Sequence, residues 1–294
     1  MHRQFSVIRR FSAFAVLAFF LVACGAPSSR SLLSANAAER DFQERVVTLS
    51  VRGYDLSLST FHPAGEPVAA LFLSHGAGGS PRAMRALVDR LCEEGFVVLA
   101  PLHRDSQDLP EAEREDRLTA FESRLADMKA TSEYASRNFP ELPFGAVGYS
   151  YGSLIALVGG GALDETTDAR VTDIRAVVTF SSPGLVPGLV DREGALATVS
   201  VPSLMIAGTD DVVPDIVLDP AEHVEYFERQ TGEDRLLVLV KNATHRFVRG
   251  RERGFDAAVQ IMVDFLEAEL LDDSAADARL RAARSNDQIE LRRR

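Results

Sequence analysis

Short apolar runs alternate with longer amphipathic segments along most of the chain. The run Ala69–Leu73 is apolar at every position, which is typical of a central parallel strand covered on both faces. Before it, residues 45–51 and 55–61 alternate apolar and polar positions around Arg52-Gly53-Tyr54. This alternation predicts a hairpin of two antiparallel strands with one buried face.

The same kind of pattern continues to residue 271. Further strands are expected at Phe96–Ala100, Phe144–Val147, Ile174–Phe180, Ser203–Ala207 and Arg235–Val240. Helical patterns lie between and after them, at about Pro81–Glu94, Leu109–Asn138, Ser153–Val158, Pro220–Thr231 and Phe255–Leu271. Alternating strands and helices predict an α/β fold with an open, mostly parallel sheet and helices on both faces. Ligand sites in such sheets lie at the carboxyl ends of the strands.

The first residues predict an export signal. Arginines at three of the first ten positions precede an apolar run, residues 11–23, that is too short for a comfortable membrane span. The run ends in Leu21-Val22-Ala23-Cys24, which resembles the lipoprotein box of bacterial signal peptides. The resemblance implies that residues 1–23 are removed and that Cys24 carries the lipid. An ordinary signal peptide cut near the same place and an uncleaved anchor are the alternatives.

Composition divides the remaining chain into a tether, a domain and a tail. Residues 24–40 are rich in serine, alanine, proline and asparagine and are expected to form a flexible tether. Residues 41–272 are expected to form one folded α/β domain, and residues 273–294 a charged tail that is mobile or loosely helical. We therefore expect an exported protein, lipid-anchored at the cell envelope on its periplasmic or outer face. The membrane leaflet and the oligomeric state stay open.

Charge and cysteine content exclude several function classes. The net charge of −11 and the lack of a clustered basic face argue against a nucleic-acid partner. The chain has two cysteines, Cys24 and Cys92. If Cys24 is acylated, Cys92 has no disulfide partner and is expected to be a small buried apolar residue. No metal site and no cofactor are expected.

The segment Gly148-Tyr149-Ser150-Tyr151-Gly152 lies between an expected strand and an expected helix. A Gly-x-Ser-x-Gly sequence in this context predicts a nucleophile elbow, in which the serine takes strained backbone angles and the flanking glycines avoid Cβ clashes. Ser150 would then stand exposed at a helix N-terminus. The alternative is a turn of small residues that packs a helix onto a strand.

A glycine-rich loop follows the first parallel strand, Ser74-His75-Gly76-Ala77-Gly78-Gly79. Such a loop can direct a main-chain N–H at a developing oxyanion, and we expect the Ala77 N–H to be that donor. The N–H of Tyr151, directly after the serine, would supply the second. A phosphate-binding turn is disfavoured because the Gly-x-Gly-x-x-Gly spacing and a P-loop lysine are both missing.

Two later strand ends carry an acid and a histidine. Either Asp210 or Asp211 could orient a catalytic imidazole, and counting from the strand end at Gly208 favours Asp211. His245 lies in the loop after the strand that ends at Val240, which gives the chain order serine, acid, histidine. Together these residues predict a Ser-His-Asp triad.

The other histidines have simpler interpretations. His2 belongs to the signal, His62 is expected in an early turn, and His223 is expected on a solvated helix face. His75 is expected to order the glycine-rich loop. His103 follows a strand and is expected either to line the pocket or to form a hydrogen bond at its rim.

Three segments resemble those of known hydrolases: Leu73–Gly79, Gly95–His103 and Gly148–Gly152. They are similar to dienelactone-hydrolase-like and platelet-activating-factor-acetylhydrolase-like bacterial esterases of the α/β-hydrolase superfamily, over about residues 41–271. The resemblance implies an α/β-hydrolase fold and cleavage of esters or lactones by a Ser-His-Asp triad. Ser150 stands where true dienelactone hydrolases have cysteine, which argues against dienelactone as the substrate.

The connection from Ser181 to Val201 is short and rich in proline, glycine and aliphatic residues. It has no room for the large inserted lid of lipases, which favours short-chain or soluble ester substrates. An amidase or peptidase that uses the same triad is an alternative. A hydrolase-fold envelope lipoprotein without catalysis is another, although it would have no need for a complete triad.

Overall fold

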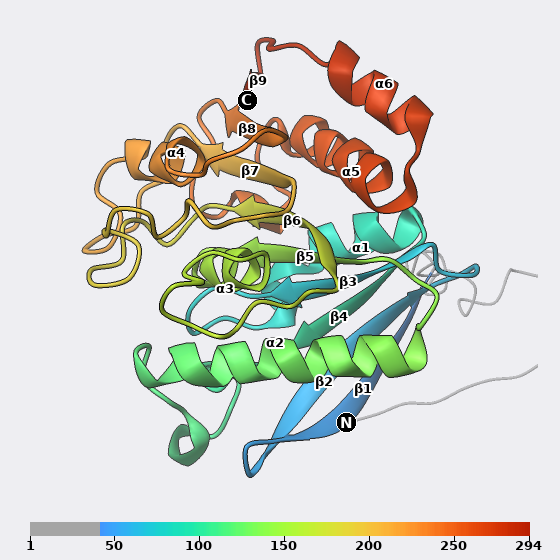
Figure 1. Cartoon of the computed structure of the whole chain (residues 1–294), viewed down its shortest axis with the longest axis vertical. Coiled ribbons are helices and arrows are strands. Elements are labelled where there is room, and N and C mark those ends of the chain that lie inside the picture. The colour runs from blue at the N-terminus through green and yellow to red at the C-terminus, as the bar shows by residue number, and fades with distance from the viewer. Residues whose placement is uncertain (1–41) are drawn as a thin grey trace, which may run out of the picture. The chain divides into compact units, whose positions relative to one another are not determined.

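Nine strands form one sheet in the computed structural model, which describes residues 42–294 of the chain (Figure 1). Their spatial order is β1-β2-β4-β3-β5-β6-β7-β8-β9. The strands from β4 to β8 pair in parallel, and β1, β2 and β9 are antiparallel to their neighbours. The strands are β1 (Phe42–Val51), β2 (Tyr54–Pro63), β3 (Ala69–Ser74), β4 (Phe96–Pro101), β5 (Phe144–Tyr149), β6 (Ile174–Phe180), β7 (Ser203–Gly208), β8 (Arg235–Val240) and β9 (Ile289–Arg293).

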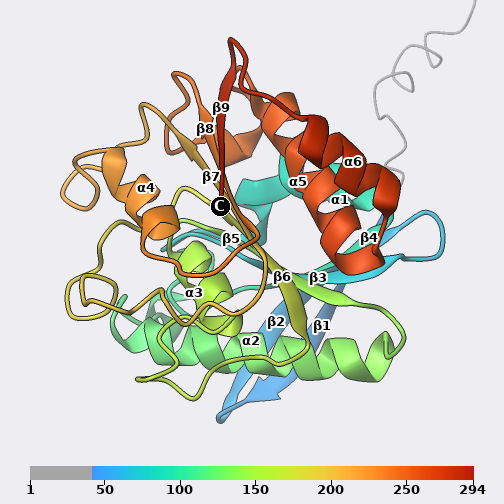
Figure 2. The same cartoon turned by 45° about the horizontal axis from the view of Figure 1, so that its top comes forward.

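Helices cover both faces of this sheet (Figures 1 and 2). The α-helices are α1 (Arg85–Glu93), α2 (Thr119–Asn138), α3 (Tyr151–Gly159), α4 (Ala221–Glu228), α5 (Phe255–Leu271) and α6 (Ser274–Ala282). Short 3-10 turns lie at Pro81–Met84, Glu111–Glu113 and Phe247–Arg249. Helices α1 and α5 pack on one face, with α6 against α5, and α2, α3 and α4 pack on the other. The predicted mostly parallel sheet with helices on both faces is thus confirmed.

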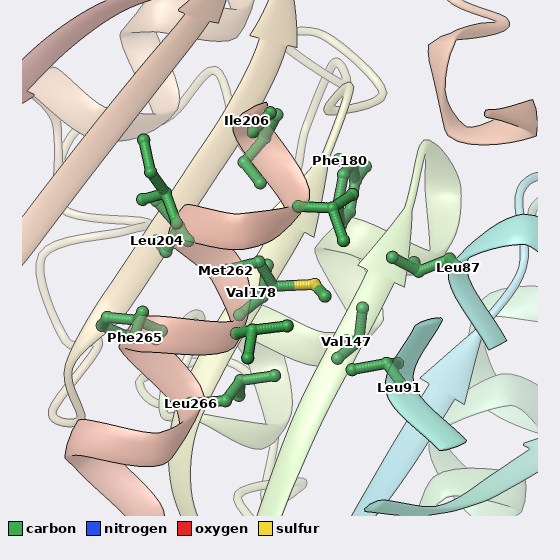
Figure 3. Packing of buried hydrophobic residues seen from close by; sticks show 14 of the residues in the cluster. Leu87, Leu91, Val147, Val178, Phe180, Leu204, Ile206, Met262, Phe265 and Leu266 are labelled. Carbon is green, nitrogen blue, oxygen red and sulfur yellow. The ribbon is translucent and has the colours of Figure 1, made fainter. Parts of the chain in front are cut away.

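Apolar side chains fill the layer between the sheet and helices α1 and α5 (Figure 3). Each parallel strand contributes residues at every second position, because alternate side chains of a strand point to opposite faces. The residues labelled in Figure 3 are Leu87 and Leu91 of α1, Met262, Phe265 and Leu266 of α5, and Val147, Val178, Phe180, Leu204 and Ile206 of the strands. All ten are buried, so this layer is a dry core.

Helix α2 differs from α1 and α5 because its buried face carries charge. Arg124 and Asp127 are both 0% exposed and face the carboxyl ends of the first parallel strands. A buried charge is costly unless it is paired and hydrogen-bonded. Arg124 and Asp127 must therefore have polar partners, and together they indicate a buried polar network near the carboxyl ends of these strands.

The C-terminal segment 273–294, expected to be a mobile or loosely helical tail, forms helix α6 and strand β9. Strand β9 pairs with β8 along its whole length and is the last strand on that side of the sheet. Helix α6 is capped by the Asp273 carboxylate and buries Ala276 and Leu280. The helical alternative holds for α6. The mobile alternative was wrong because the buried Leu280 and Ile289 and a row of main-chain hydrogen bonds to β8 hold a segment that has few large apolar residues.

Several predictions concern residues outside the described range, namely the signal peptide 1–23, the lipidation of Cys24 and the tether 24–40. Within residues 42–294, no helix combines the length and the apolar character that a membrane crossing requires. Cys92 is buried with a free thiol, as predicted, and burial raises the pKa of this thiol to about 12.

Candidate active site

Ser150 lies at a sharp turn between β5 and α3. Its φ of 54° and ψ of −121° belong to a region that residues with a Cβ rarely occupy, which costs about 1–3 kcal/mol. A Cβ on Gly148 would lie 2.2 Å from the carbonyl oxygen of Gly152, and one on Gly152 would lie 2.0 Å from that of Ser74. Both positions therefore require glycine, and the segment has the geometry of a nucleophile elbow.

The structure brings Ser150, His245 and Asp211 together at the carboxyl ends of three parallel strands. The Ser150 Oγ is 3.1 Å from Nε2 of His245, and Nδ1 of His245 is 2.7 Å from Oδ1 of Asp211. His245 keeps 18% of its side chain exposed, whereas Asp211 is fully buried. This is the arrangement in which an imidazole can accept a proton from a serine hydroxyl while a carboxylate holds its tautomer.

Of the two candidate acids, Asp211 is the one at hydrogen-bond distance from His245. Asp210 is exposed, and its main-chain N–H bonds the carbonyl oxygen of Ala243. Burial alone would raise the pKa of Asp211, but hydrogen bonds from His223 and His245 outweigh it and hold the pKa well below its ordinary value. The Asp211 carboxylate is thus charged at neutral pH.

His223, expected on a solvated face of its helix, is 1% exposed and lies against Asp211. The expectation was wrong because α4 presents this position to the turn after β7 rather than to solvent. His62, expected in a turn, lies within β2 and is hydrogen-bonded to Thr60.

Tyr149 supports the histidine from the elbow. Its hydroxyl donates a hydrogen bond of 2.7 Å to the main-chain carbonyl of His245, and the two rings lie 5.1 Å apart. The hydroxyl stays protonated because burial, above all, raises the pKa of Tyr149 well above its ordinary value. The residue before the serine therefore holds the loop that carries the imidazole.

The glycine-rich loop lies beside the elbow, and its Ala77 lines the same cavity as Ser150, Tyr151 and His245. The N–H groups of Ala77 and Tyr151 donate no hydrogen bond to any described residue. Both are thus free to donate to a ligand oxygen, which an oxyanion hole requires.

His75 orders this loop as the sequence predicts. Its Nδ1 is 2.8 Å from the carbonyl oxygen of Gly76, and its Nε2 accepts a hydrogen bond of 3.1 Å from the main-chain N–H of His103. An accepting Nε2 leaves the proton on Nδ1, so His75 donates to Gly76. His103 itself neither lines the cavity nor lies at its rim, contrary to both expectations, because it is buried behind the loop.

Arg124 holds the same loop from below. Its guanidinium donates to the carbonyl oxygens of His75 and Gly76, at 2.7 and 3.2 Å. It also forms a two-pronged ion pair with Asp105, with N···O distances of 2.9 and 3.0 Å. Asp105 in turn accepts from the N–H of Gly78 at 2.9 Å. The two charges therefore bind the loop on both sides of Ala77.

A second Ser-His-Asp arrangement lies in the interior of the domain, at Ser74, His103 and Asp127. Nε2 of His103 is 2.9 Å from Ser74 Oγ, its Nδ1 is 2.8 Å from Asp127 Oδ2, and Tyr54 donates to the other Asp127 oxygen. Ser74, His103 and Asp127 are each 0% exposed, so no substrate reaches them. This set has the distances of a triad but serves as a structural network.

Ser150 lines a cavity of about 760 Å³. Apolar side chains from three segments form most of its wall. They are Leu118 and Phe121, then Pro183, Leu185, Val186, Pro187 and Leu189, and finally Val213, Ile216 and Val217. Arg117 and Asp215 also line the cavity and place one charge of each sign in its wall. Such a cavity binds a small, largely apolar molecule next to the serine hydroxyl.

One group among the described residues has metal-ligating atoms close together, namely Asp211, His223 and His245, within 4.8 Å of one another. The imidazole nitrogens that face Asp211 carry protons, because each is hydrogen-bonded to an oxygen that only accepts. A metal ion here would replace both hydrogens and break the contact between His245 and Asp211.

Sequence reasoning missed Arg124, Asp105 and the role of His223. Asp105 follows a strand end and could have been singled out by the rule that located Asp211 and His245. Arg124 lies within a helix that contains several charged residues, and no local pattern distinguishes it.

No protein-family model and no curated protein matches the sequence. Among solved structures, a dienelactone hydrolase from Anabaena variabilis superposes with a TM-score of 0.58 at 24% identity, over 78% of this chain and 99% of that one. A cold-adapted esterase from an Arctic intertidal metagenomic library gives 0.61 at 17% identity, over 78% and 95%. An esterase of Pyrococcus furiosus gives 0.58 at 19%, over 78% and 92%. The likeness establishes that the chain has the α/β-hydrolase fold, as predicted.

Proposed function

We propose that the protein is a serine hydrolase that cleaves carboxylic esters through Ser150, His245 and Asp211. The observation that carries the proposal is the chain of two hydrogen bonds, of 3.1 and 2.7 Å, that joins these side chains, of which Ser150 and His245 line an accessible cavity. The buried Ser74–His103–Asp127 set has similar distances but no access, so access and geometry together single out Ser150.

The chemistry follows from the protonation states. Asp211 is ionised and accepts the Nδ1–H of His245, which leaves Nε2 free to take the proton of Ser150 as its Oγ attacks the ester carbonyl. The imidazolium then returns this proton to the leaving alcohol, and an acyl-enzyme is left on Ser150. A water molecule, deprotonated by the same Nε2, releases the carboxylic acid and restores the serine.

The negative charge on the ester oxygen develops beside the main-chain N–H groups of Ala77 and Tyr151. Both groups are fixed before substrate arrives, Ala77 through the loop bound by Arg124 and Tyr151 by the first turn of α3. Hydrogen-bond donors that need no rearrangement stabilise the transition state more than mobile donors do.

We further propose that the substrates are short-chain or soluble esters. The β6–β7 connection, residues 181–202, contributes one apolar wall and contains no helix that would act as a lid. A cavity of about 760 Å³ is in the range that encloses most of a small molecule. We expect p-nitrophenyl acetate and butyrate to be cleaved with a higher kcat/KM than esters of long fatty acids. A higher value for the long-chain esters would contradict this proposal.

A fluorophosphonate probe tests the serine directly, since it reacts with activated serine hydroxyls. We expect wild-type protein and a Ser74→Ala variant to be labelled and a Ser150→Ala variant not to be. In the same series, Ser150→Ala or His245→Ala should lower kcat by several orders of magnitude with little change in KM. Wild-type protein that is neither labelled nor active on any ester would instead favour a binding or scaffold role for the fold.

Amide substrates belong in the same screen. The nucleophile and the oxyanion donors of ester and amide cleavage are the same, so an amidase or peptidase is the second candidate reaction. A higher kcat/KM on amides than on esters with the same acyl group would assign that activity.

Export and lipid anchoring at Cys24 complete the proposal. The apolar run 11–23 supports it, because its last three residues and Cys24 form the box Leu21-Val22-Ala23-Cys24. The enzyme would then act at the cell envelope, on its periplasmic or outer face, on esters that reach it from solution.

A further inference from the structure

Two imidazoles meet at one oxygen of Asp211. Oδ1 is 2.7 Å from Nδ1 of His245 and 3.1 Å from Nε2 of His223, and the two rings are nearly parallel with their centres 6.4 Å apart. Within residues 42–294, the other oxygen, Oδ2, is buried without a hydrogen-bond partner. Among the described residues, the hydrogen bonds that orient this carboxylate therefore come from the two histidines.

The hydrogen-bond partners of His223 determine where its proton lies. Nε2 is 3.0 Å from the main-chain carbonyl oxygen of Asp211 as well as near its carboxylate, and both groups only accept. Nε2 therefore carries a hydrogen. Nδ1 is 2.8 Å from Ser182 Oγ, which itself accepts from the N–H of Gly184 at 3.4 Å. The Ser182 hydroxyl can thus donate to Nδ1, and this arrangement satisfies a neutral imidazole.

We propose that His223 is a positioning residue of the active site, and that Ser182 holds its tautomer. The Nε2–H of His223 fixes both the main chain and the carboxylate of Asp211, so that Oδ1 stays directed at His245. The proposal rests on the proposed function, because it concerns how the acid of that triad is held.

The surroundings of Asp211 show why a second support is needed. The turn after β7 is open to solvent on either side of Asp211, since Asp210 and Val212 are exposed. His223 comes from α4, which packs against β7 and β8, and is 1% exposed. His223, which is held within α4, thus fixes the position of Asp211 in a solvent-exposed turn.

Other ionisable groups near this cluster have partners of their own. Tyr149 packs against the His245 ring, and its hydroxyl donates a hydrogen bond to the main-chain carbonyl oxygen of His245. Glu222, next to His223 on α4, accepts from the main-chain N–H groups of Leu185 and Leu218. Neither group replaces the donor that His223 gives to Asp211.

The test compares His223→Leu with His223→Gln in the full-length protein. A glutamine amide reaches about as far as the imidazole Nε2 and keeps an N–H donor, whereas leucine fills the space without one. For the leucine variant we expect kcat to fall about ten-fold or more, as for the loss of one hydrogen bond to a charged group, with KM little changed. Glutamine should restore most of the lost activity.

The pH dependence of kcat/KM distinguishes a positioning role of His223 from a role in folding alone. The Nε2–H of His223 draws charge from the Asp211 carboxylate, so its removal strengthens the attraction of that carboxylate for the His245 imidazolium. The acid limb of kcat/KM should therefore move to higher pH in His223→Leu. Ser182→Ala should shift it in the same direction with a smaller loss of kcat, and this variant carries the test if the leucine variant fails to fold.

Gln230→Leu is the matched control. The substitution removes the buried hydrogen bonds that Gln230 forms with the Ser203 hydroxyl and with the main-chain carbonyl of Tyr226. Gln230 forms no hydrogen bond with Asp211 or His245. The substitution should lower the Tm without moving the acid limb. Wild-type protein without activity would contradict the proposed function. Active wild type with an unshifted acid limb in both the leucine and Ser182→Ala variants, or glutamine as impaired as leucine, would overturn the inference on His223.

Discussion

The guanidinium of Arg124 and the carboxylate of Asp105 form a two-pronged ion pair that is sealed from solvent under the glycine-rich loop. Both partners also bind main-chain groups of that loop, so the pair connects α2 and the segment after β4 to the proposed oxyanion donor at Ala77. Removing one charge leaves the other buried without compensation, which is more costly than replacing both.

We therefore predict that Arg124→Met loses both stability and activity. The unpaired Asp105 should lower the free energy of unfolding by about 3–5 kcal/mol, and the loosened loop should lower kcat by about ten- to a hundred-fold. Adding Asp105→Asn should recover part of the Tm but not kcat, because the carbonyls of His75 and Gly76 still lack their donor. Recovery of kcat along with Tm would show that the loop does not depend on Arg124.

A second prediction assigns the acid. Asp211→Asn removes the charge that holds and stabilises the His245 imidazolium, and kcat should fall by about four orders of magnitude. Asp210→Asn changes an exposed side chain and should alter kcat by less than about three-fold. Steady-state kinetics on one ester measures both. Equal, mild losses would mean that neither carboxylate orients His245.

The sequence alone predicted strands β1 to β8, the elbow and the strand-end residues because each leaves a local signature. Apolar runs mark the parallel strands, and the glycines at 148 and 152 are required by clashes within the turn itself and with Ser74. Parallel strands then bring their carboxyl ends to one edge, so Ser150 and His245 meet although 95 positions separate them.

The polar support of the site left no such signature. Arg124 binds a carbonyl 49 positions away, and whether that helix position faces solvent or the sheet depends on the partner. His223 appeared to be a solvated helix residue for the same reason. A buried polar side chain is defined by the groups that satisfy it, and these come from other elements of the fold.

A third prediction concerns the anchor. Cys24→Ser removes the sulfur that would carry the proposed lipid, so the protein should move from the membrane fraction to the soluble fraction. Fractionation followed by immunoblotting measures the change, and Cys92→Ser is the control because that thiol is buried in the domain. Membrane association that survives Cys24→Ser would refute lipidation at this position.

The last prediction concerns pH and stability. Burial raises the pKa of Asp127 to about 7, although the hydrogen bond from Tyr54 and the charge of Arg124 lower it. In the unfolded chain an aspartate has a pKa of about 3.9. Between about pH 4 and 7 the folded protein therefore holds a proton that the unfolded chain releases, and stability falls as pH rises through this window.

Asp127→Asn should remove this decline. Its amide can accept from Tyr54 and donate to Nδ1 of His103, whose other nitrogen then donates to Ser74, so every group of the network keeps a partner. We expect the Tm of the wild type to fall more than that of the variant between pH 5 and pH 8. Because the buried network does not touch substrate, kcat should change little. Parallel Tm profiles would show that Asp127 does not titrate with the raised pKa.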